Sequence, residues 1–491
     1  MDGQAAEQKV AEMSLEDQLA RLPQDLLIRI FVHKICSGGG GNAIVNRALL
    51  ALRLLSKGLK VASDSARTSI TLESCHLRDA ASLLRKLTHL TAITVRGSAA
   101  QADPLHDLSP LPTTHPGLAS LTINSGGGHS MNVRDIHALL QPWRHSLTHL
   151  DVHCCPFVPA VGEPLGPDDS THYTTPIGHW SPDLPHLTSL ALRYGHLKSL
   201  DLSGCPRLTE LRLEANSLTR LTPSGMERLH TVSCTDEGAL QTLDLSGCSA
   251  LQTLDCCDNA SLGALDLSGC TALTRLKLWS NHRLPGLDLT SCVSLESLSC
   301  QQSHALTRLD LRGCGQLQSV RCRRNPSLGV LQLPAAGRLR QLSCRTDGIV
   351  ALELSACLAL QELDVSCQWA MTGLDVSGLR ALRDLHCSGN CVMGSVVMAG
   401  CTRLGAVTCT GNGVLEAVEV SGCRALRRMV CRDNAKLTVL DLSHCRLLGC
   451  LDTRGCEQLA AVDVSCCPEL RHVDGKVVGT GGADKRACCI S

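Results

Sequence analysis

The chain has 491 residues and no net formal charge, because 46 lysines and arginines balance 46 aspartates and glutamates. A neutral chain gives no electrostatic reason to expect nucleic acid or acidic surfaces as partners. Apolar residues make up 44% of the chain and aromatic residues only 2%, so the core must be built from leucine, valine, alanine and cysteine. The polar, charged N-terminus does not resemble a secretory signal peptide, and no run of about 18 apolar residues predicts a membrane span. We therefore expect a cytoplasmic protein whose 30 cysteines stay reduced.

After a disordered start over residues 1–15, we expect residues 16–66 to form a short helical segment. It opens with LPQDLLIRIF (22–31), in which the proline can begin a helix and the apolar side chains share one face. A glycine-rich gap and a second helical stretch with LRLLSK (52–57) follow. This pattern resembles an F-box. Two departures from it are the longer first loop and Gly58–Leu59, where an F-box usually has an aromatic residue.

The F-box resemblance implies a role for this segment. It would dock on the Skp-type adaptor of a cullin-RING ubiquitin ligase of the SCF type, while the rest of the chain holds a target protein. The chain would do no chemistry itself and would need no cofactor, because it only concentrates target lysines near a charged ubiquitin carrier. The adaptor-binding residues implied are Leu22, Pro23, Leu26, Leu27, Ile30, Phe31, Leu54 and Ser56. The alternative is that the helices only cap one end of a repeat array.

Residues 67–183 are expected to form irregular, longer repeats with loops. Strand-like triplets begin at Ile93, Leu121 and Leu150, and VRDIHALLQPWRH (133–145) between the last two alternates like an amphipathic helix. A similar helical stretch, LRDAASLLRKL (77–87), precedes the first triplet. These units resemble the helix-bearing leucine-rich repeats of the ribonuclease-inhibitor kind.

Residues 184–474 form a regular array in which every step is 21 or 22 residues. A fixed period of this length predicts a solenoid with one coil per repeat. The repeats begin at Leu200, Leu221, Leu243, Leu265, Leu287, Leu309, Leu331, Leu352, Leu374, Val396, Val418, Leu440 and Val462.

Each coil has two halves, of the form L-D-L-S-G-C and L-x-C-x-x-N. Each half alternates apolar and polar residues, so each predicts a short strand with two inward residues and one outward residue. The coil is too short for a helix, and its strands should stack in parallel on those of neighbouring coils. The array resembles leucine-rich repeats, in the cysteine-type version of bacterial internalins. The expected class is therefore an α+β repeat protein, with a helical N-terminal segment followed by a leucine-rich-repeat solenoid of parallel strands.

The repeated cysteines could be a disulfide framework, a row of metal ligands or small apolar plugs in a core. Where a repeat lacks the cysteine, residues such as Met226, Leu379, Leu213 and Leu278 replace it. Leucine can replace a core plug but not a metal ligand or half of a disulfide. We therefore expect structural ladders of thiols and no metal site. The recurring asparagines should satisfy backbone groups where each coil turns.

The outward residue of each half suggests which face binds a target. In the first half it is almost always acidic, and we expect these acids to accept hydrogen bonds from adjacent turns. In the second half it varies, as a recognition surface requires, although drift without selection would also produce variety. The predicted target-binding residues on a concave sheet are Arg212, Asp255, Lys277, Arg321, Asp364 and His386.

Residues 475–491 should form a flexible tail that ends in a C-a-a-X pattern, Cys488-Cys489-Ile490-Ser491. A terminal serine favours a farnesyl group on Cys488, which would attach the protein peripherally to a membrane, although chance in a cysteine-rich chain is the alternative. The sequence has no phosphate-binding loop, metal-ligand cluster or nucleophile set, so we do not expect an enzyme. The alternative function is a leucine-rich-repeat scaffold for protein–protein interaction that is unrelated to ubiquitin.

Overall fold

The computed structural model describes residues 69–73, 91–96, 117–124, 131–132, 137, 139–153, 157–158, 177–335, 337–346, 348–442, 444–459, 462, 464, 466–474 and 476–477. The F-box-like segment, the helix expected at 77–87 and the tail with Cys488 lie outside these residues. The chain divides into two compact units, Met1–Glu163 and Pro164–Ser491.

The first unit contains a parallel sheet built from the longer repeats. Ile93, Leu121 and Leu150 are in register on neighbouring strands, which is the arrangement that their spacing predicted. Of the helix expected at 133–145, residues 137, 139 and 140 are helical, and the 3-10 turn Gln141–Trp143 follows them. The sheet strands are β1 (Ser69–Glu73), β2 (Ala92–Arg96), β3 (Ser120–Asn124) and β5 (His149–His153), and a small pair is β4 (Met131–Asn132) with β6 (Phe157–Val158).

The second unit is a solenoid in which the second half of every coil adds one strand to a long parallel sheet. Its strands pair in chain order from β8 to β32, and β33 closes the edge in the antiparallel direction. The strands are β8 (Ser189–Arg193), β10 (Glu210–Glu214), β12 (Thr231–Thr235), β14 (Thr253–Asp255), β16 (Arg275–Lys277), β18 (Ser297–Ser299), β20 (Ser319–Arg321), β22 (Gln341–Ser343), β23 (Glu362–Asp364), β25 (Asp384–His386), β27 (Ala406–Thr408), β29 (Arg428–Val430), β31 (Cys450–Asp452), β32 (His472–Val473) and β33 (Lys476–Val477).

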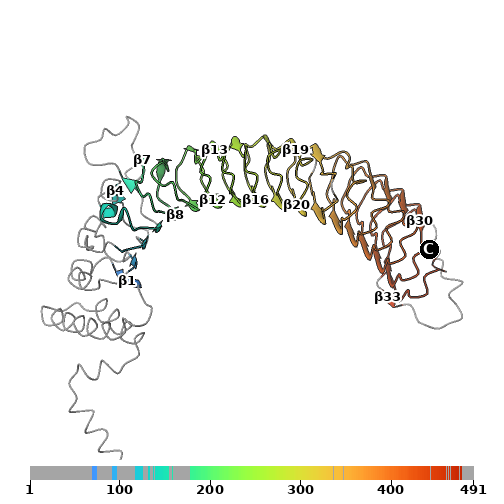
Figure 1. Ribbon diagram of the computed structural model, residues 1–491. Coiled ribbons are helices and arrows are strands. Elements are labelled where there is room, and N and C mark those ends of the chain that lie inside the picture. Colours follow the sequence, from blue (N-terminus) through green and yellow to red (C-terminus); the bar gives the residue numbers. More distant parts are fainter. Residues whose placement is uncertain are drawn as a thin grey trace, which may run out of the picture. The chain divides into compact units, whose positions relative to one another are not determined.

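The first halves of the coils form short, interrupted sheets on the opposite side. Within this unit, β12, β16 and β20 lie along the inner side of the curved stack and β13 and β19 along its outer side (Figure 1). The short-sheet strands are β7 (Ile177–Trp180), β9 (Leu197–Leu200), β11 (Arg220–Leu221), β13 (Thr242–Asp244), β15 (Ala264–Asp266), β17 (Gly286–Leu287), β19 (Arg308–Asp310), β21 (Val330–Gln332), β24 (Gly373–Asp375), β26 (Ser395–Val397), β28 (Ala417–Glu419) and β30 (Val439–Asp441).

The described residues therefore form a parallel-strand β-solenoid of the leucine-rich-repeat type. Helical geometry among them is confined to the short stretch around residues 137–143. The helical part of the expected α+β class falls almost wholly on residues outside the described ranges.

The repeated cysteines are buried in the core, as the substitution pattern predicted. Those of the two half-coil ladders are almost completely buried, and Cys256 and Cys270, for example, have no exposed surface. Most first-half thiols also donate a hydrogen bond to a carbonyl of the preceding coil, for example from Cys270 Sγ to Leu245 O at 3.3 Å and from Cys401 Sγ to Val376 O at 3.1 Å. Cysteine therefore combines a small apolar volume with a weak donor for a buried carbonyl, which alanine or valine lacks.

The asparagines form a second ladder along the turn that follows the long sheet. Asn325 Nδ2 donates to Cys300 O of the preceding coil at 2.7 Å, and its Oδ1 accepts the Ser303 N–H at 2.7 Å. The row is Asn216, Glu237, Asn259, Asn281, Ser303, Asn325, Thr346, Gln368, Asn390, Asn412 and Asn434, and all these residues are buried. Each coil thus supplies donors and acceptors to the backbone of the coil before it, so the turns are fixed from coil to coil.

The residue before each ladder position except Thr346 adopts a left-handed backbone. Asp258, Arg324, Cys367 and Asp433 have φ values between 53° and 60°. A single residue with left-handed backbone angles changes the direction of the chain sharply, which lets a short coil turn away from the sheet.

Candidate functional site

The six predicted target-binding residues lie on one row of the long sheet. Register pairs connect Arg212 to Ser233, Ser233 to Asp255, Asp255 to Lys277, and so on without interruption to Asp364 and His386. Each side chain stands beside the buried middle residue of its strand and points outward, as the pleat requires. We call this the central row.

Two members of the central row are ion-paired to each other. Lys277 Nζ lies 3.1 Å from Asp255 Oδ2 on the neighbouring strand. Arg212 pairs with Glu210 on its own strand, whereas Arg321 is exposed and makes no side-chain hydrogen bond or ion pair with any residue that the structure describes. The structure thus brings the row together but leaves its members with different partners.

Sequence reasoning missed a second outward row on the long sheet. In the second half of each coil, this row is formed by the residue directly after the second inward residue. It is Arg193, Glu214, Thr235, Cys257, Trp279, Gln301, Arg323, Arg345, Ser366, Ser388, Thr410, Arg432 and Arg454. We call it the flanking row. A signal was present, because this position varies along the chain as much as the central row does.

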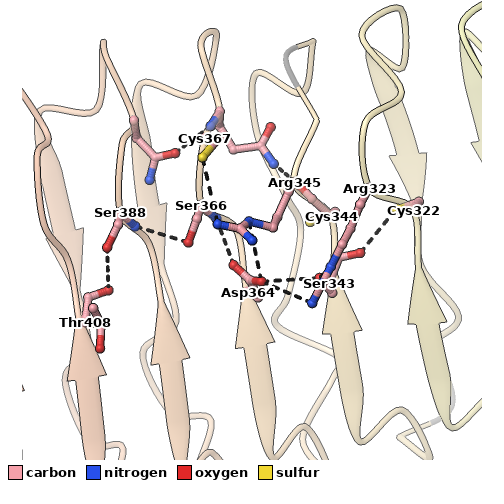
Figure 2. Close-up of polar contacts among 12 residues, drawn as sticks. Cys322, Arg323, Ser343, Cys344, Arg345, Asp364, Ser366, Cys367, Ser388 and Thr408 are labelled. Atoms are coloured by element: carbon pink, nitrogen blue, oxygen red, sulfur yellow. Dashed lines mark hydrogen bonds and ion pairs between the residues drawn. The ribbon is translucent and has the colours of Figure 1, made fainter. Parts of the chain in front are cut away.

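An arginine–aspartate–arginine cluster joins the two rows near the middle of the sheet (Figure 2). Asp364 Oδ2 lies 3.4 Å from Arg323 Nη2 and 3.7 Å from Arg345 Nε, and the Asp364 side chain is only 18% exposed. Arg323 Nε also donates to Ser343 Oγ at 2.7 Å. One carboxylate between two guanidinium groups leaves the cluster with a net positive charge and holds the arginine side chains in place.

Uncharged groups continue the surface beyond Asp364. Ser366 Oγ accepts the Ser388 N–H at 3.3 Å, and Ser388 Oγ accepts the Thr410 N–H at 2.9 Å (Figure 2 shows the first of these contacts). These hydroxyls join adjacent coils, so the flanking row is polar but uncharged from Ser366 to Thr410.

A second cluster of the same kind lies near the end of the sheet. Asp452, whose side chain is 5% exposed, accepts two hydrogen bonds from Arg454, at 3.0 and 2.8 Å, and another from Arg432 Nε at 2.6 Å. The Arg454 guanidinium, with help from Arg432, holds the pKa of the Asp452 carboxyl far below its usual value. Asp452 is therefore a permanently ionised anchor for two arginines.

The acidic row of the short sheets has a structural role. Asp244 Oδ1 accepts the Ser246 N–H at 2.9 Å, and Asp266 and Asp375 bind the backbone two residues ahead in the same way. Hydrogen bonds from Ser268 lower the pKa of Asp266, because they stabilise its ionised form. The expectation that these acids accept hydrogen bonds from adjacent turns is confirmed. In each case the turn is the one that directly follows the acid's own strand.

Burial favours the protonated form of thiols in both ladders. Burial raises the pKa of Cys270 and of Cys300 to about 12, so neither is a nucleophile near neutral pH. Cys456 differs, because its hydrogen bond with the Cys431 side chain lowers the Cys456 pKa to about 7.

Within the described ranges, no group of three or more His, Cys, Asp or Glu side chains is arranged to hold a metal ion. None of the helical residues described belongs to a helix long and apolar enough to cross a bilayer.

Comparisons with known proteins are consistent with this architecture. The family model described as "Leucine Rich repeat" matches residues 433–449, so the chain contains a leucine-rich repeat. No curated protein matches the chain.

Several solved structures resemble the solenoid. The functional domain of InlJ from Listeria monocytogenes, described as including a cysteine ladder, is 23% identical with a TM-score of 0.35, and the match covers 58% of this chain and 62% of that one. YopM from Yersinia enterocolitica is 18% identical with a TM-score of 0.34, over 71% of this chain and 74% of that one. The internalin InlF from Listeria monocytogenes is 14% identical with a TM-score of 0.30, over 72% and 93%.

Proposed function

We propose that this leucine-rich-repeat solenoid is the non-catalytic, target-binding subunit of an SCF-type ubiquitin ligase. The observation that supports a binding role is the contrast between the two faces of the coils. The short-sheet face repeats one acidic residue that serves its own turn, whereas the long-sheet face varies in charge and size from coil to coil. A stacked scaffold needs the first pattern, and selective binding of a partner needs the second.

The connection to ubiquitin rests on the F-box resemblance of residues 16–66. In this proposal the apolar face around Leu26 and Phe31 binds the Skp-type adaptor, the adaptor binds a cullin, and the central row holds a target protein. The solenoid then acts as a spacer that presents the target, so all selectivity resides in the long sheet.

Capture of a purified Skp-type adaptor by the full chain tests the proposal. We expect the intact chain to retain the adaptor and a Leu26→Asp, Phe31→Asp variant to lose it, because two charges would enter an apolar interface. A matched control replaces Val293 and Val439, which are 50% and 56% exposed on the solenoid, with aspartate and should leave capture unchanged.

Failure of the intact chain to retain the adaptor would contradict the ligase role. It would leave the alternative, a protein-interaction scaffold unrelated to ubiquitin, because the argument for binding by the long sheet does not depend on the F-box.

The C-terminal pattern supports a further part of the proposal, farnesylation of Cys488 and peripheral attachment to a membrane. A Cys488→Ser variant should lose label from a radioactive prenyl donor, while Cys489→Ser, its matched neighbour, should keep it. Equal labelling of both variants would contradict attachment at this cysteine.

A further inference from the structure

Charge is segregated along the long sheet. Four positions of each coil face the long-sheet side, namely the two that flank the inward residue of the strand and the two that follow the second inward residue; on the β22 coil the last of them is the buried Thr346. Over four consecutive coils, from β16 to β22, these positions hold six basic residues and no acidic residue. The basic residues are Arg275, Lys277, Arg321, Arg323, Arg324 and Arg345. We call this region the basic stretch.

Acidic coils border the basic stretch on both sides. The two coils before it, β12 and β14, present Asp236, Asp255 and Asp258 at the same positions. The two coils after it, β23 and β25, present Glu362, Asp364 and Asp384. The face therefore alternates from acidic to basic to acidic along the stack.

Acidic residues partly neutralise the two ends of the basic stretch. Lys277 pairs with Asp255 at one border, and Arg323 and Arg345 pair with Asp364 at the other (Figure 2). Arg321 and Arg324, on the same coil, are exposed and make no side-chain hydrogen bond or ion pair with a described residue. Arg275 donates to the Thr253 hydroxyl and has no ion pair with a described residue, so two of the three basic side chains without an acidic partner lie on the coil that carries β20.

An exposed tryptophan lies on the coil that carries β16, two coils before β20. Trp279 is 43% exposed, and its Nε1 donates to Ser299 Oγ of the next coil at 2.6 Å, which holds the indole on the sheet. Two other tryptophans, Trp143 and Trp180, are 1% exposed. A fixed, exposed aromatic ring on the same face as several arginines has the composition of a binding hot spot.

We propose that the basic stretch binds a short acidic segment of a partner protein in an extended conformation. Coils about 4.8 Å apart make four coils roughly 19 Å wide, which an extended chain crosses in about six residues at roughly 3.3 Å each. The segment lies along the stack, with its carboxylates toward Arg321 and Arg324 and an apolar group against Trp279.

The acidic borders set the length and the class of the partner. A longer polyanion such as a nucleic acid would place phosphates over Asp258 and Glu362, where like charges repel. A short acidic run flanked by basic or neutral residues matches the whole face. The inference rests on the proposal that the long sheet holds the target, and it names the chemistry of that target.

The test is fluorescence anisotropy of a labelled hexaglutamate peptide with the full chain. We expect binding that weakens as salt is added, and an Arg321→Glu, Arg324→Glu variant that binds about tenfold more weakly. The matched control is Arg380→Glu, Arg383→Glu, which changes net charge equally at exposed positions off the sheet and should bind as the parent does. Trp279→Ala should weaken severalfold the binding of a peptide in which a leucine replaces one terminal glutamate, and should change hexaglutamate binding little, because only the first peptide offers an apolar group to the indole.

Three outcomes overturn the inference. They are failure of the parent chain to bind hexaglutamate, an equal loss in the control variant, and tighter binding of a labelled oligothymidylate than of the peptide. Adaptor capture is measured on the same preparations, so a chain that retains the adaptor but ignores hexaglutamate would refute only this inference.

Discussion

Replacing Asn434 by alanine tests whether the asparagine ladder holds the coils together. Asn434 Nδ2 donates to Cys409 O at 2.7 Å and to Cys431 O at 2.8 Å, and its Oδ1 accepts the Asn412 N–H at 2.8 Å. Alanine would leave Cys409 O and the Asn412 N–H buried without these partners, whereas Cys431 O would still accept the Cys456 thiol at 2.9 Å. An unsatisfied buried polar group costs about 1–3 kcal/mol, so the variant should lose about 2–6 kcal/mol of unfolding free energy. A loss of this size is a large part of the roughly 5–15 kcal/mol that stabilises a typical domain.

The control for this prediction is Asn412→Ala in the same ladder. Asn412 Oδ1 accepts the Asn390 N–H at 2.8 Å, but its Nδ2 has no hydrogen-bond partner among the described residues. It should therefore cost about 1–3 kcal/mol, well below Asn434→Ala. Urea unfolding followed by circular dichroism gives the free energies, and amide hydrogen exchange shows whether the coils around residue 434 open first. Equal losses in the two variants would refute the argument that the number of ladder hydrogen bonds determines stability.

Three further predictions follow from buried or strained positions. Burial raises the pKa of Glu237, so its contribution to stability is complete below its usual pKa near 4.5 and is lost as pH rises through the raised value. Glu237→Gln, which imitates Gln368 in the same ladder, should therefore stabilise the chain more at pH 8 than at pH 5 in thermal unfolding, and a pH-independent gain would contradict this. Gly411 has φ +68° and nothing within 4 Å of an added Cβ, so Gly411→Ala should cost only the conformational term of about 1 kcal/mol in urea unfolding. In the native protein at pH 8, iodoacetamide should modify the exposed Cys367 but not Cys270, as mass spectrometry of the peptides would show, and rapid modification of Cys270 would contradict its burial.

Much of the solenoid could be predicted because the sequence repeats with a period of 21 or 22 residues. Leucine or valine at fixed spacing places Leu243 and Leu265 on neighbouring coils, and the structure pairs them in register. The ladder role of the cysteines followed from the apolar residues that replace them, without any coordinates.

The surface was predicted only in part. The sequence pattern of each half-coil, inward–outward–inward, contains one outward residue, and the flanking row lies one residue after this pattern. Trp279 and Arg345 therefore escaped attention, although they flank the predicted row. The Arg323–Asp364 pair was also out of reach, since the two residues are 41 positions apart and lie two coils apart along the sheet. The register of the stacked strands is needed to show that the Arg323 side chain reaches past the coil of β22 to Asp364 on the coil of β23.

The antiparallel strand β33 changes what the end of the long sheet can do. A parallel stack ends in a row of unpaired backbone donors and acceptors, to which any extended chain can add. Here the final parallel strand already bonds to a reversed, two-residue neighbour. Because β33 has only two residues, it exposes few backbone donors and acceptors with which a strand of a second molecule could pair. We therefore expect the hairpin to oppose end-to-end association of solenoids into fibres. Removing the hairpin is therefore expected to promote self-association at that terminus.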